Sequence, residues 1–473
     1  MKDSSLSDID AVGHAELVSS GQATPRELAE AAVERIEAVN PQLNAVVLEW
    51  FDAAIAGADD APDGPLRGVP FLLKDIGATQ KGTPTYLGNR AMKAADNRAP
   101  ADSVLGARFR AAGLVTLGKT NLPELGTVPV TQPKAFGPTN NPWDLGRSPS
   151  GSSGGSAAAV ASGMVPVAHA NDGGGSTRLP ASWNGLVGLK TTRGRQPLPE
   201  GVSRLTSELV VSRTVRDTAA VLDATHGHTP ACVFQLPPPG RPFGDELGQD
   251  IGRPRVAVLT DAGAEYDADP ECVEAAWVAA RQLESWGCEV VEVDASVIFG
   301  PLSRVNGRAW MAGITRRVDA LGEVLGWPLA KEHVDPYNWV AADRGRSISA
   351  ADAAAAAETQ QVWVRQMFEW MHPFDLLVTP TSGCPPLLTS EAEPDADKPW
   401  RVGRLYGLVG RFTMPFNVTG HPAISLPLHW TTDGLPVGSQ IVGRMGDEAA
   451  LLRVASRFEA EMPWNHRRPP VSA

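Results

Sequence analysis

Three separated segments of the chain carry residues that could perform acyl-transfer chemistry. The first is Lys74, which directly follows the apolar run 69–73. A lysine at the end of a buried strand either reaches the surface or is held away from water. In the second case desolvation disfavours the ammonium form and lowers the pKa, which makes the amine a usable base. Taken alone, Lys74 fits a surface lysine better than a base.

The other two segments combine serine with glycine. Residues 150–156 are all Ser or Gly and lead into an alanine-rich stretch, where a hydroxyl could sit at the start of a helix. In residues 172–178, Gly173, Gly174 and Gly175 directly precede Ser176, and consecutive glycines let their amide N–H groups converge on an oxyanion. An N-cap and a glycine turn are the ordinary interpretations. The three segments together, without a histidine-based triad, favour a serine nucleophile with a lysine base.

Other motifs indicate less chemistry. Residues 113–120 match the P-loop pattern, but the spacer reads as a strand and Pro123 interrupts the helix that should follow, which argues against ATP binding. His169 lies close to the glycine segment and is a rival base, although a lone histidine is more often a packing residue. No His, Cys and Asp residues cluster with zinc spacing. The sequence therefore predicts no metal and no cofactor.

The composition is that of a folded acidic protein. The 473 residues include 42 Lys and Arg against 54 Asp and Glu, so the net charge is −12, and 42% of the residues are hydrophobic. This charge argues against binding to nucleic acid or to an anionic membrane, and no run of about 18 apolar residues is present for a membrane span. The four cysteines form no CxxC pair, and the start of the chain resembles no secretory signal. We therefore expect a cytoplasmic protein.

Short apolar strands alternate with helices along the chain. The first sixty residues read as helical, with a capping box at Thr24, Pro25 and Glu27. Further helices are expected over 103–112, 157–161, 271–286 and 350–371. Buried strands are expected over 69–73, 114–117, 165–168, 186–189, 255–259 and 289–293, and Asp433 with Gly434 predicts a hairpin turn. This order predicts an α/β fold with a largely buried sheet that positions the three segments.

Four stretches of the sequence resemble the amidase signature family of serine hydrolases. They are residues 68–75, 118–121, 141–191 and 417–423, and the likeness runs over nearly the whole chain. The resemblance implies a single α/β/α domain with a large mixed central sheet flanked by helices. It also makes the P-loop match a family feature. Within the family, the sequence is most similar to hydrolases of 6-aminohexanoate cyclic dimer, a nylon oligomer, and to bacterial urethanases.

The resemblance assigns a Ser–cis-Ser–Lys triad, residue by residue. Ser176 is the implied nucleophile, Ser152 the bridging serine that follows a cis peptide bond, and Lys74 the base. Many members have threonine in place of Asn171, a departure that we expect to affect the surroundings of the glycine loop and not the triad. The remaining implied residues are the oxyanion donors Gly173, Gly174, Gly175 and Ser176, and the supporting residues Gly151, Ser153, Asp172 and Arg178.

The substrate pocket is expected in the variable second half of the chain. The predicted organisation is 1–60 for N-terminal helices, 66–230 for the core with the triad, 230–254 for a Pro- and Gly-rich connection, and 295–400 for the pocket and its cover. Gly126, Thr127 and Trp310 are the candidate substrate-binding residues. The acidic stretch 391–397 is predicted to be a mobile cover. Five tryptophans either line an apolar pocket or pack in the core: Trp310, Trp327, Trp339, Trp363 and Trp370.

The resemblance implies an amidohydrolase acting on small molecules. It would cleave amide or carbamate bonds of bulky or aromatic substrates through an acyl- or carbamoyl-enzyme, and the sequence leaves a homodimer open. One alternative is the amidase-like component of a tRNA-dependent amidotransferase complex, against which the absence of a basic tract argues. Another is an inactive binding protein, which the presence of all three triad positions disfavours.

Overall fold

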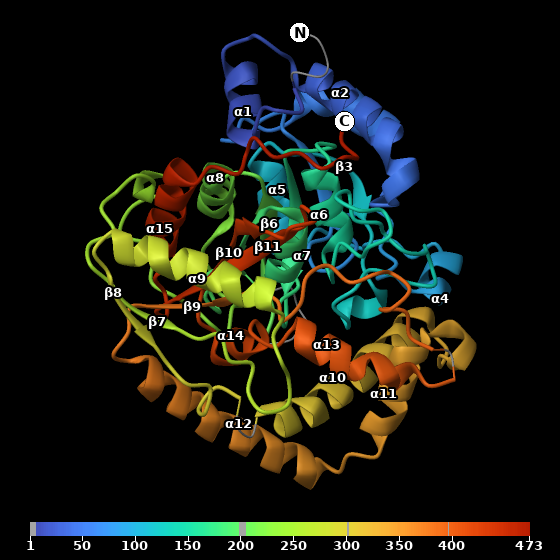
Figure 1. The fold of residues 1–473 in the computed structure, drawn as a ribbon. Helices are drawn as coiled ribbons and strands as arrows, with labels where there is room; N and C mark the ends of the chain where they lie inside the picture. The colour runs from blue at the N-terminus through green and yellow to red at the C-terminus, as the bar shows by residue number, and fades with distance from the viewer. Residues whose placement is uncertain (1–5, 198–204, 300–301, 396) are drawn as a thin grey trace.

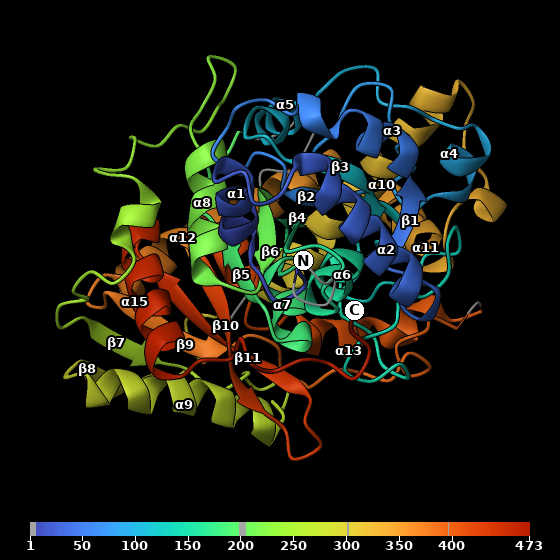
Figure 2. The same ribbon diagram turned by 90° about the horizontal axis from the view of Figure 1, so that it is seen from above.

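A mixed β-sheet of eleven strands runs through the computed structural model, which describes residues 6–197, 205–299, 302–395 and 397–473 (Figures 1 and 2). The order across the sheet is β1-β3-β2-β4-β6-β5-β10-β11-β9-β7-β8. The strands are β1 (Val46–Glu49), β2 (Pro70–Lys74), β3 (Val115–Thr120), β4 (Val167–Asp172), β5 (Val187–Lys190), β6 (Ser207–Ser212), β7 (Arg255–Val258), β8 (Glu289–Glu292), β9 (Leu376–Pro380), β10 (Ala423–Trp430) and β11 (Pro436–Gly443).

Parallel and antiparallel pairs alternate in blocks along this sheet. Strand β2 is parallel to both β3 and β4, and β7 is parallel to both β8 and β9. The intervening pairs, from β4–β6 to β11–β9, are antiparallel. The central strands are buried along their whole length, as parallel strands covered by helices on both faces usually are. The predicted α/β class with a large mixed sheet is confirmed.

Helices pack around the sheet as Figures 1 and 2 show. They are α1 (Ala11–Ser19), α2 (Pro25–Leu43), α3 (Phe51–Ala56), α4 (Arg90–Ala94), α5 (Val104–Ala111), α6 (Gly154–Ala161), α7 (Arg178–Asn184), α8 (Val215–Thr225), α9 (Pro270–Ser285), α10 (Leu302–Leu325), α11 (Pro336–Arg346), α12 (Ala350–Met371), α13 (Gly403–Val409), α14 (Met414–Thr419) and α15 (Glu448–Glu461). Within the described ranges, none of them has the length and hydrophobicity that crossing a membrane requires.

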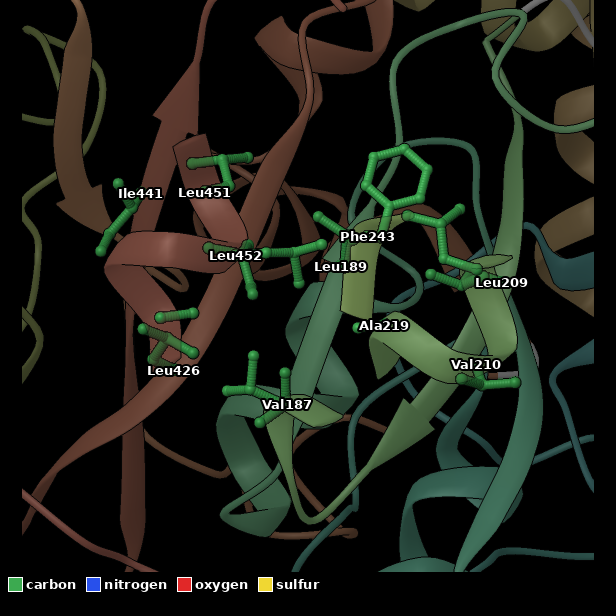
Figure 3. Packing of buried hydrophobic residues seen from close by; sticks show 14 of the residues in the cluster. Val187, Leu189, Leu209, Val210, Ala219, Phe243, Leu426, Ile441, Leu451 and Leu452 are labelled. Atoms are coloured by element: carbon green, nitrogen blue, oxygen red, sulfur yellow. The ribbon is translucent and has the colours of Figure 1, made fainter. Parts of the chain in front are cut away.

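The largest hydrophobic core lies between the sheet and helices such as α8 and α15. Figure 3 shows side chains of β5, β6, β10 and β11 packed against both helices. Phe243, from the Pro- and Gly-rich connection 230–254, is buried in the same cluster. The labelled members are Val187, Leu189, Leu209, Val210, Ala219, Phe243, Leu426, Ile441, Leu451 and Leu452. The connection is therefore anchored to the core near its middle.

Local sequence signals explain where many elements begin and end. The Thr24 side chain accepts from the Glu27 amide while Glu27 accepts from the Thr24 amide, which confirms the capping box at the start of α2. Residues 115–120 form β3, so the P-loop spacer is a strand as expected. The hairpin between β10 and β11 turns at Gly434, whose φ of 81° favours glycine. The expectation of helices alone in the first sixty residues is wrong, because residues 46–49 form β1 against β3.

The sheet itself brings the catalytic candidates together. Strands β2 and β4 are parallel neighbours, with Phe71 opposite Val167 and Leu72 opposite Ala168. Their carboxyl ends therefore lie at the same edge of the sheet. Lys74 ends β2, and Asn171 and Asp172 end β4. Helices α10, α11 and α12 lie together along the bottom of the molecule in Figure 1.

Candidate active site

Lys74 is completely buried and fully hydrogen-bonded. Its Nζ lies 2.7 Å from Ser152 Oγ, 2.9 Å from Ser153 Oγ and 2.6 Å from Asn171 Oδ1. Three acceptors match the three protons of an ammonium group, and a neutral amine in the same place can accept the proton of a serine hydroxyl. The side chain is thus held in one position by serine and amide oxygens and makes no direct contact with a described carboxylate.

The environment favours the neutral amine. Burial lowers the pKa of Lys74 to about 7, against the opposing effect of the negative charges of Glu208 and Asp172. The positive charge of Arg317 adds to the lowering. A pKa near neutrality is what a general base needs, because a substantial fraction of the amine is unprotonated and ready to take a proton at the working pH.

Ser152 lies between this lysine and an open cavity. The Gly151–Ser152 peptide bond is cis, as the family resemblance implies. Both residues line the cavity together with Gly126. A side chain at position 126 would begin only 3.3 Å from Ser152 Oγ, and the φ of Gly126 is +64°, so glycine keeps the approach to this hydroxyl open.

Ser176 lines the same cavity from the glycine loop. Its carbonyl accepts from the Ser153 amide at 3.2 Å, which ties the two serine-containing loops together. The Ser176 hydroxyl forms no hydrogen bond with the described residues, so a nucleophile at this position is unencumbered. Serine–base contacts that are absent without substrate often form only in the reacting complex.

Asp172 shapes the glycine loop through a buried ion pair. Its carboxylate accepts from Arg178 Nε at 2.8 Å and Nη2 at 2.9 Å, and from Asn417 Nδ2 at 2.9 Å. Burial alone would raise the pKa of Asp172, but the Arg178 charge and hydrogen bonds hold it well below its usual range. Arg178 also donates to Thr413 O and to Gln440 Oε1, so the pair connects β4 to α14 and β11.

The position of Gly175 corrects one predicted role. Its amide N–H donates to Asp172 Oδ1 at 2.6 Å, and Gly175 does not line the cavity. Its φ is +136°, and a Cβ would lie 2.3 Å from Thr413 Oγ1, so the residue is needed for the backbone path. The amides of Gly173, Gly174 and Ser176 border the cavity without an acceptor among the described residues. Of the four predicted oxyanion donors, Gly175 is therefore the one whose amide is already used within the loop.

Asn171 and His169 occupy positions that the sequence did not predict. Asn171 contacts the Lys74 amine directly, so the expectation that this departure spares the triad is wrong. His169 is buried beneath it, where Nε2 pairs with Glu208 Oε2 at 2.8 Å and Nδ1 accepts from the Lys74 amide at 3.3 Å. His169 does not line the cavity. The arrangement therefore suits a support for β2 and β4 better than a base acting on Ser176.

The cavity has a volume of about 560 Å³ and a mostly apolar wall. Gly126, Thr127 and Trp310 all line it, as expected of substrate-binding candidates. Of the five tryptophans considered, the other four lie elsewhere: Trp363, Trp339 and Trp370 pack in hydrophobic clusters, and Trp327 is exposed. Helices α10 and α13 supply much of the wall.

The predicted acidic cover is attached to a residue of the cavity wall, Tyr406, but its described residues do not themselves line the cavity. Ala392 is buried, and its carbonyl accepts from the Tyr406 hydroxyl at 2.7 Å. No described residue of the 391–397 stretch lines the cavity, and residue 396 lies outside the described ranges. The role of a cover is therefore not supported. Within the described part of the chain, no group of three His, Cys, Asp or Glu side chains is placed to hold a metal ion.

Sequence reasoning missed two groups that shape the site. Glu208 lies in β6, a strand that was not predicted, although an acidic residue inside the apolar run 207–212 signals a buried polar role. Arg317 lies in α10 and lines the cavity. Its sequence neighbours Arg316 and Asp319 are exposed, and nothing in the local pattern distinguishes Arg317 from them.

Comparison with known proteins agrees with this geometry. A family model described as Amidase matches residues 27–452. The 6-aminohexanoate-cyclic-dimer hydrolase of Paenarthrobacter ureafaciens is 39% identical over 98% of this chain and 96% of that protein, and the acylamidase of Rhodococcus erythropolis is 34% identical over 100% and 99%. A solved structure of 6-aminohexanoate cyclic dimer hydrolase complexed with substrate has a TM-score of 0.94 and 37% identity, covering 99% of this chain and 100% of that one. The chain therefore belongs to the amidase signature family and is an amidohydrolase.

Proposed function

We propose that this amidohydrolase cleaves amide and carbamate C–N bonds through a relay from Ser176 by way of Ser152 to Lys74. The observation that carries the proposal is the contact of 2.7 Å between Lys74 Nζ and Ser152 Oγ, because it connects a fully buried amine with a pKa of about 7 to the cavity that Ser176 lines. The names of the similar proteins, a cyclic-dimer hydrolase and an acylamidase, support amide bonds as the substrate class.

The relay performs both proton transfers of the reaction. Neutral Lys74 takes the Ser152 proton as Ser152 takes that of Ser176, and Ser176 Oγ forms a bond to the substrate carbonyl carbon. The resulting oxyanion accepts hydrogen bonds from the glycine-loop amides. When the C–N bond breaks, the Lys74 ammonium returns its proton through Ser152 to the leaving nitrogen. Water then attacks the acyl-enzyme that an amide leaves, or the alkoxycarbonyl-enzyme that C–N cleavage of a carbamate leaves, by the same relay and releases Ser176.

The cavity supports bulky or aromatic substrates. Its wall includes the rings of Trp310, Tyr337 and Phe299, and its volume lies within the range usual for sites that bind drug-sized molecules. An aromatic ring of the substrate could stack on these side chains. A carbamate and an amide are both uncharged and present the same carbonyl group to Ser176. We therefore expect the site to accept both.

A substrate panel tests this proposal. The purified chain alone should hydrolyse anilides and aryl carbamates with kcat/KM at least about tenfold above that for acetamide, since the larger groups bury more apolar surface in the cavity. The measurement is initial-rate kinetics on aliphatic amides, cyclic amides, anilides and carbamates. Turnover of acetamide alone would contradict the proposal. Activity that appears only when partner proteins are added would also contradict it, because a component of an amidotransferase complex behaves in that way.

Ser152→Ala is expected to lower kcat by about 10²- to 10⁴-fold, because Lys74 then has no route to Ser176. The matched control is Ser153→Ala, which removes another hydroxyl that contacts Lys74 Nζ, at 2.9 Å, but does not line the cavity. We expect the control to lose less activity than Ser152→Ala. A near-normal kcat in Ser152→Ala would mean that Lys74 contacts Ser176 directly or that another base acts.

A further inference from the structure

The cavity carries a charge opposite to that of the protein. The chain has a net charge of −12, yet the described residues that line the cavity include no Asp or Glu. The only charged side chains among them are Arg317 and Arg411. A mostly apolar cavity with a cationic wall favours ligands that combine apolar groups with a negative charge.

Arg317 has no acidic partner in the described structure. It lies in α10, where Nη1 donates to the Leu125 carbonyl at 3.1 Å and the guanidinium lies 6.0 Å from the centre of the Trp310 ring. Burial lowers its pKa, and no compensating negative charge is present among the described residues. The rest of the guanidinium fork, Nε and Nη2, makes no hydrogen bond with the described residues. A partly buried guanidinium with free donors is unfavourable unless something fills them.

Three other arginines of this protein each lie close to a carboxylate. Arg178 is paired with Asp172 at 2.8 Å, and Arg195 with Glu448 at 3.0 Å. Arg411, on the same cavity, lies 3.7 Å from Glu265 and packs 4.0 Å from the centre of the Phe299 ring. Arg317 alone among these four lacks a carboxylate among the described residues. Because Arg317 also lines the cavity, a ligand in the cavity is the partner that its remaining donors can reach.

Arg317 also lies close to the reacting centre. Its acceptor Leu125 directly precedes Gly126, and a side chain at position 126 would begin 3.3 Å from Ser152 Oγ. A group bound to Arg317 would thus be a short distance from the scissile bond. The short distance between Arg317 and the scissile bond suits a small substrate that carries both the anionic group and the amide.

We propose that Arg317 binds a carboxylate of the substrate, so that the enzyme prefers amides or carbamates that carry a free carboxylate. The proposal rests on the proposed function. A planar guanidinium with two free N–H donors can hold a carboxylate through two parallel hydrogen bonds, a geometry that lysine cannot reproduce. The carboxylate can belong to the acyl part or to the amine part of the substrate.

Two substrate pairs test this inference and separate the two parts. Adipic acid monoanilide and hexananilide differ only in a terminal carboxylate or methyl group on the acyl chain. The amide of benzoic acid with 6-aminohexanoate and N-hexylbenzamide differ in the same way on the amine chain. The wild-type enzyme should prefer the carboxylate in at least one pair, and Arg317→Met should reduce that ratio of kcat/KM by about tenfold to a hundredfold.

The neutral member of each pair measures every effect of a substitution on the rate except its effect on carboxylate binding. Any effect of Arg317→Met on folding or on the pKa of Lys74 changes the rates of both members alike, so it cancels from the ratio. Arg411→Met is the matched control, and it should keep the wild-type ratio whatever its overall rate. Arg317→Lys should retain only part of the preference, since it keeps the charge and loses the fork.

Binding measured without turnover distinguishes this inference from the proposed function. In the Ser176→Ala background, calorimetry should give a Kd for the carboxylate ligand that Arg317→Met weakens by a similar factor, with the neutral ligand unaffected. If the wild-type enzyme turns over none of the four compounds, the proposed function is contradicted. The binding measurement would still decide whether Arg317 holds a carboxylate. Equal affinity for both members of both pairs, or a preference that Arg317→Met leaves unchanged, would overturn the carboxylate site.

Discussion

Ser176→Ala is expected to lower kcat by on the order of 10⁴- to 10⁶-fold while the protein stays folded. The reason is that the substitution removes only the attacking oxygen. The Ser176 hydroxyl forms no hydrogen bond with the described residues, so its loss leaves no buried partner unpaired among them, and the melting temperature should change by less than about 2 °C. Initial rates on an anilide and thermal unfolding measured on the same preparation check both parts.

Covalent labelling gives a second measurement of the same assignment. A fluorophosphonate-type probe should add its mass to the peptide that contains Ser176 in the wild-type enzyme and to no peptide in Ser176→Ala. Ser153→Ala, which changes another serine near the base, should still be labelled at Ser176. If Ser176→Ala retains more than about 1% of the activity, or if the probe labels Ser152, the nucleophile is not Ser176.

The strand that ends at the candidate base Lys74 and its neighbour could be predicted in part, because buried strands have continuous apolar sequences. The apolar run before Lys74 and the run 165–168 are both continuous, which is typical of parallel strands covered on both faces. The structure forms β2 at Pro70–Lys74 and the neighbouring β4 at Val167–Asp172, so the second predicted strand begins two residues too early and ends four residues too early. What the runs do not encode is which strands are neighbours. That information lies in contacts between distant segments, so only the family resemblance could bring Lys74 near Ser152.

Residues that act through long-range contacts could not be found in the same way. In the sequence Asn171 is a neighbour of the glycines, whereas its side chain points from β4 towards β2 and the lysine amine. Gly173, Gly174 and Gly175 look equivalent in the sequence. In the described structure the Gly175 amide donates a hydrogen bond to the Asp172 carboxylate, whereas no bond from the other two amides to this carboxylate is found. Arg317 looks like any surface arginine until the fold places α10 against the cavity.

Lys74→Arg is expected to be nearly as inactive as Lys74→Ala, with a loss of at least about 10³-fold in kcat. Arginine keeps the positive charge and roughly the length, but its guanidinium cannot give up a proton in the working range of pH and so cannot act as a base. Rates measured between pH 5 and pH 9 on one anilide check this, alongside circular dichroism to confirm that each variant is folded.

The pH dependence of the wild-type enzyme follows from the same lysine. If Lys74 is the base, its neutral amine is the active form, and burial lowers the pKa of Lys74 to about 7. Activity should therefore rise by about tenfold per pH unit well below pH 7, by about fivefold between pH 6 and pH 7, and level off above pH 8. The neutral fraction is about a tenth at pH 6, about half at pH 7 and about nine tenths at pH 8. An unperturbed lysine would instead place the rise near about pH 10.4.

Lys74→Arg and His169→Ala, measured together, separate Lys74 from the rival base. The wild-type pH profile alone does not discriminate between the two residues, because a rise with pH is expected of any base that must lose a proton before it acts. Glu208→Gln removes a negative charge that raises the pKa of Lys74, so it should move the rise to lower pH if Lys74 is the base. The same carboxylate also lies 2.8 Å from His169 Nε2, so the shift in Glu208→Gln does not by itself identify the base. If Lys74→Arg is active, and if adding His169→Ala abolishes the rise of its activity with pH, then His169 and not Lys74 is the base.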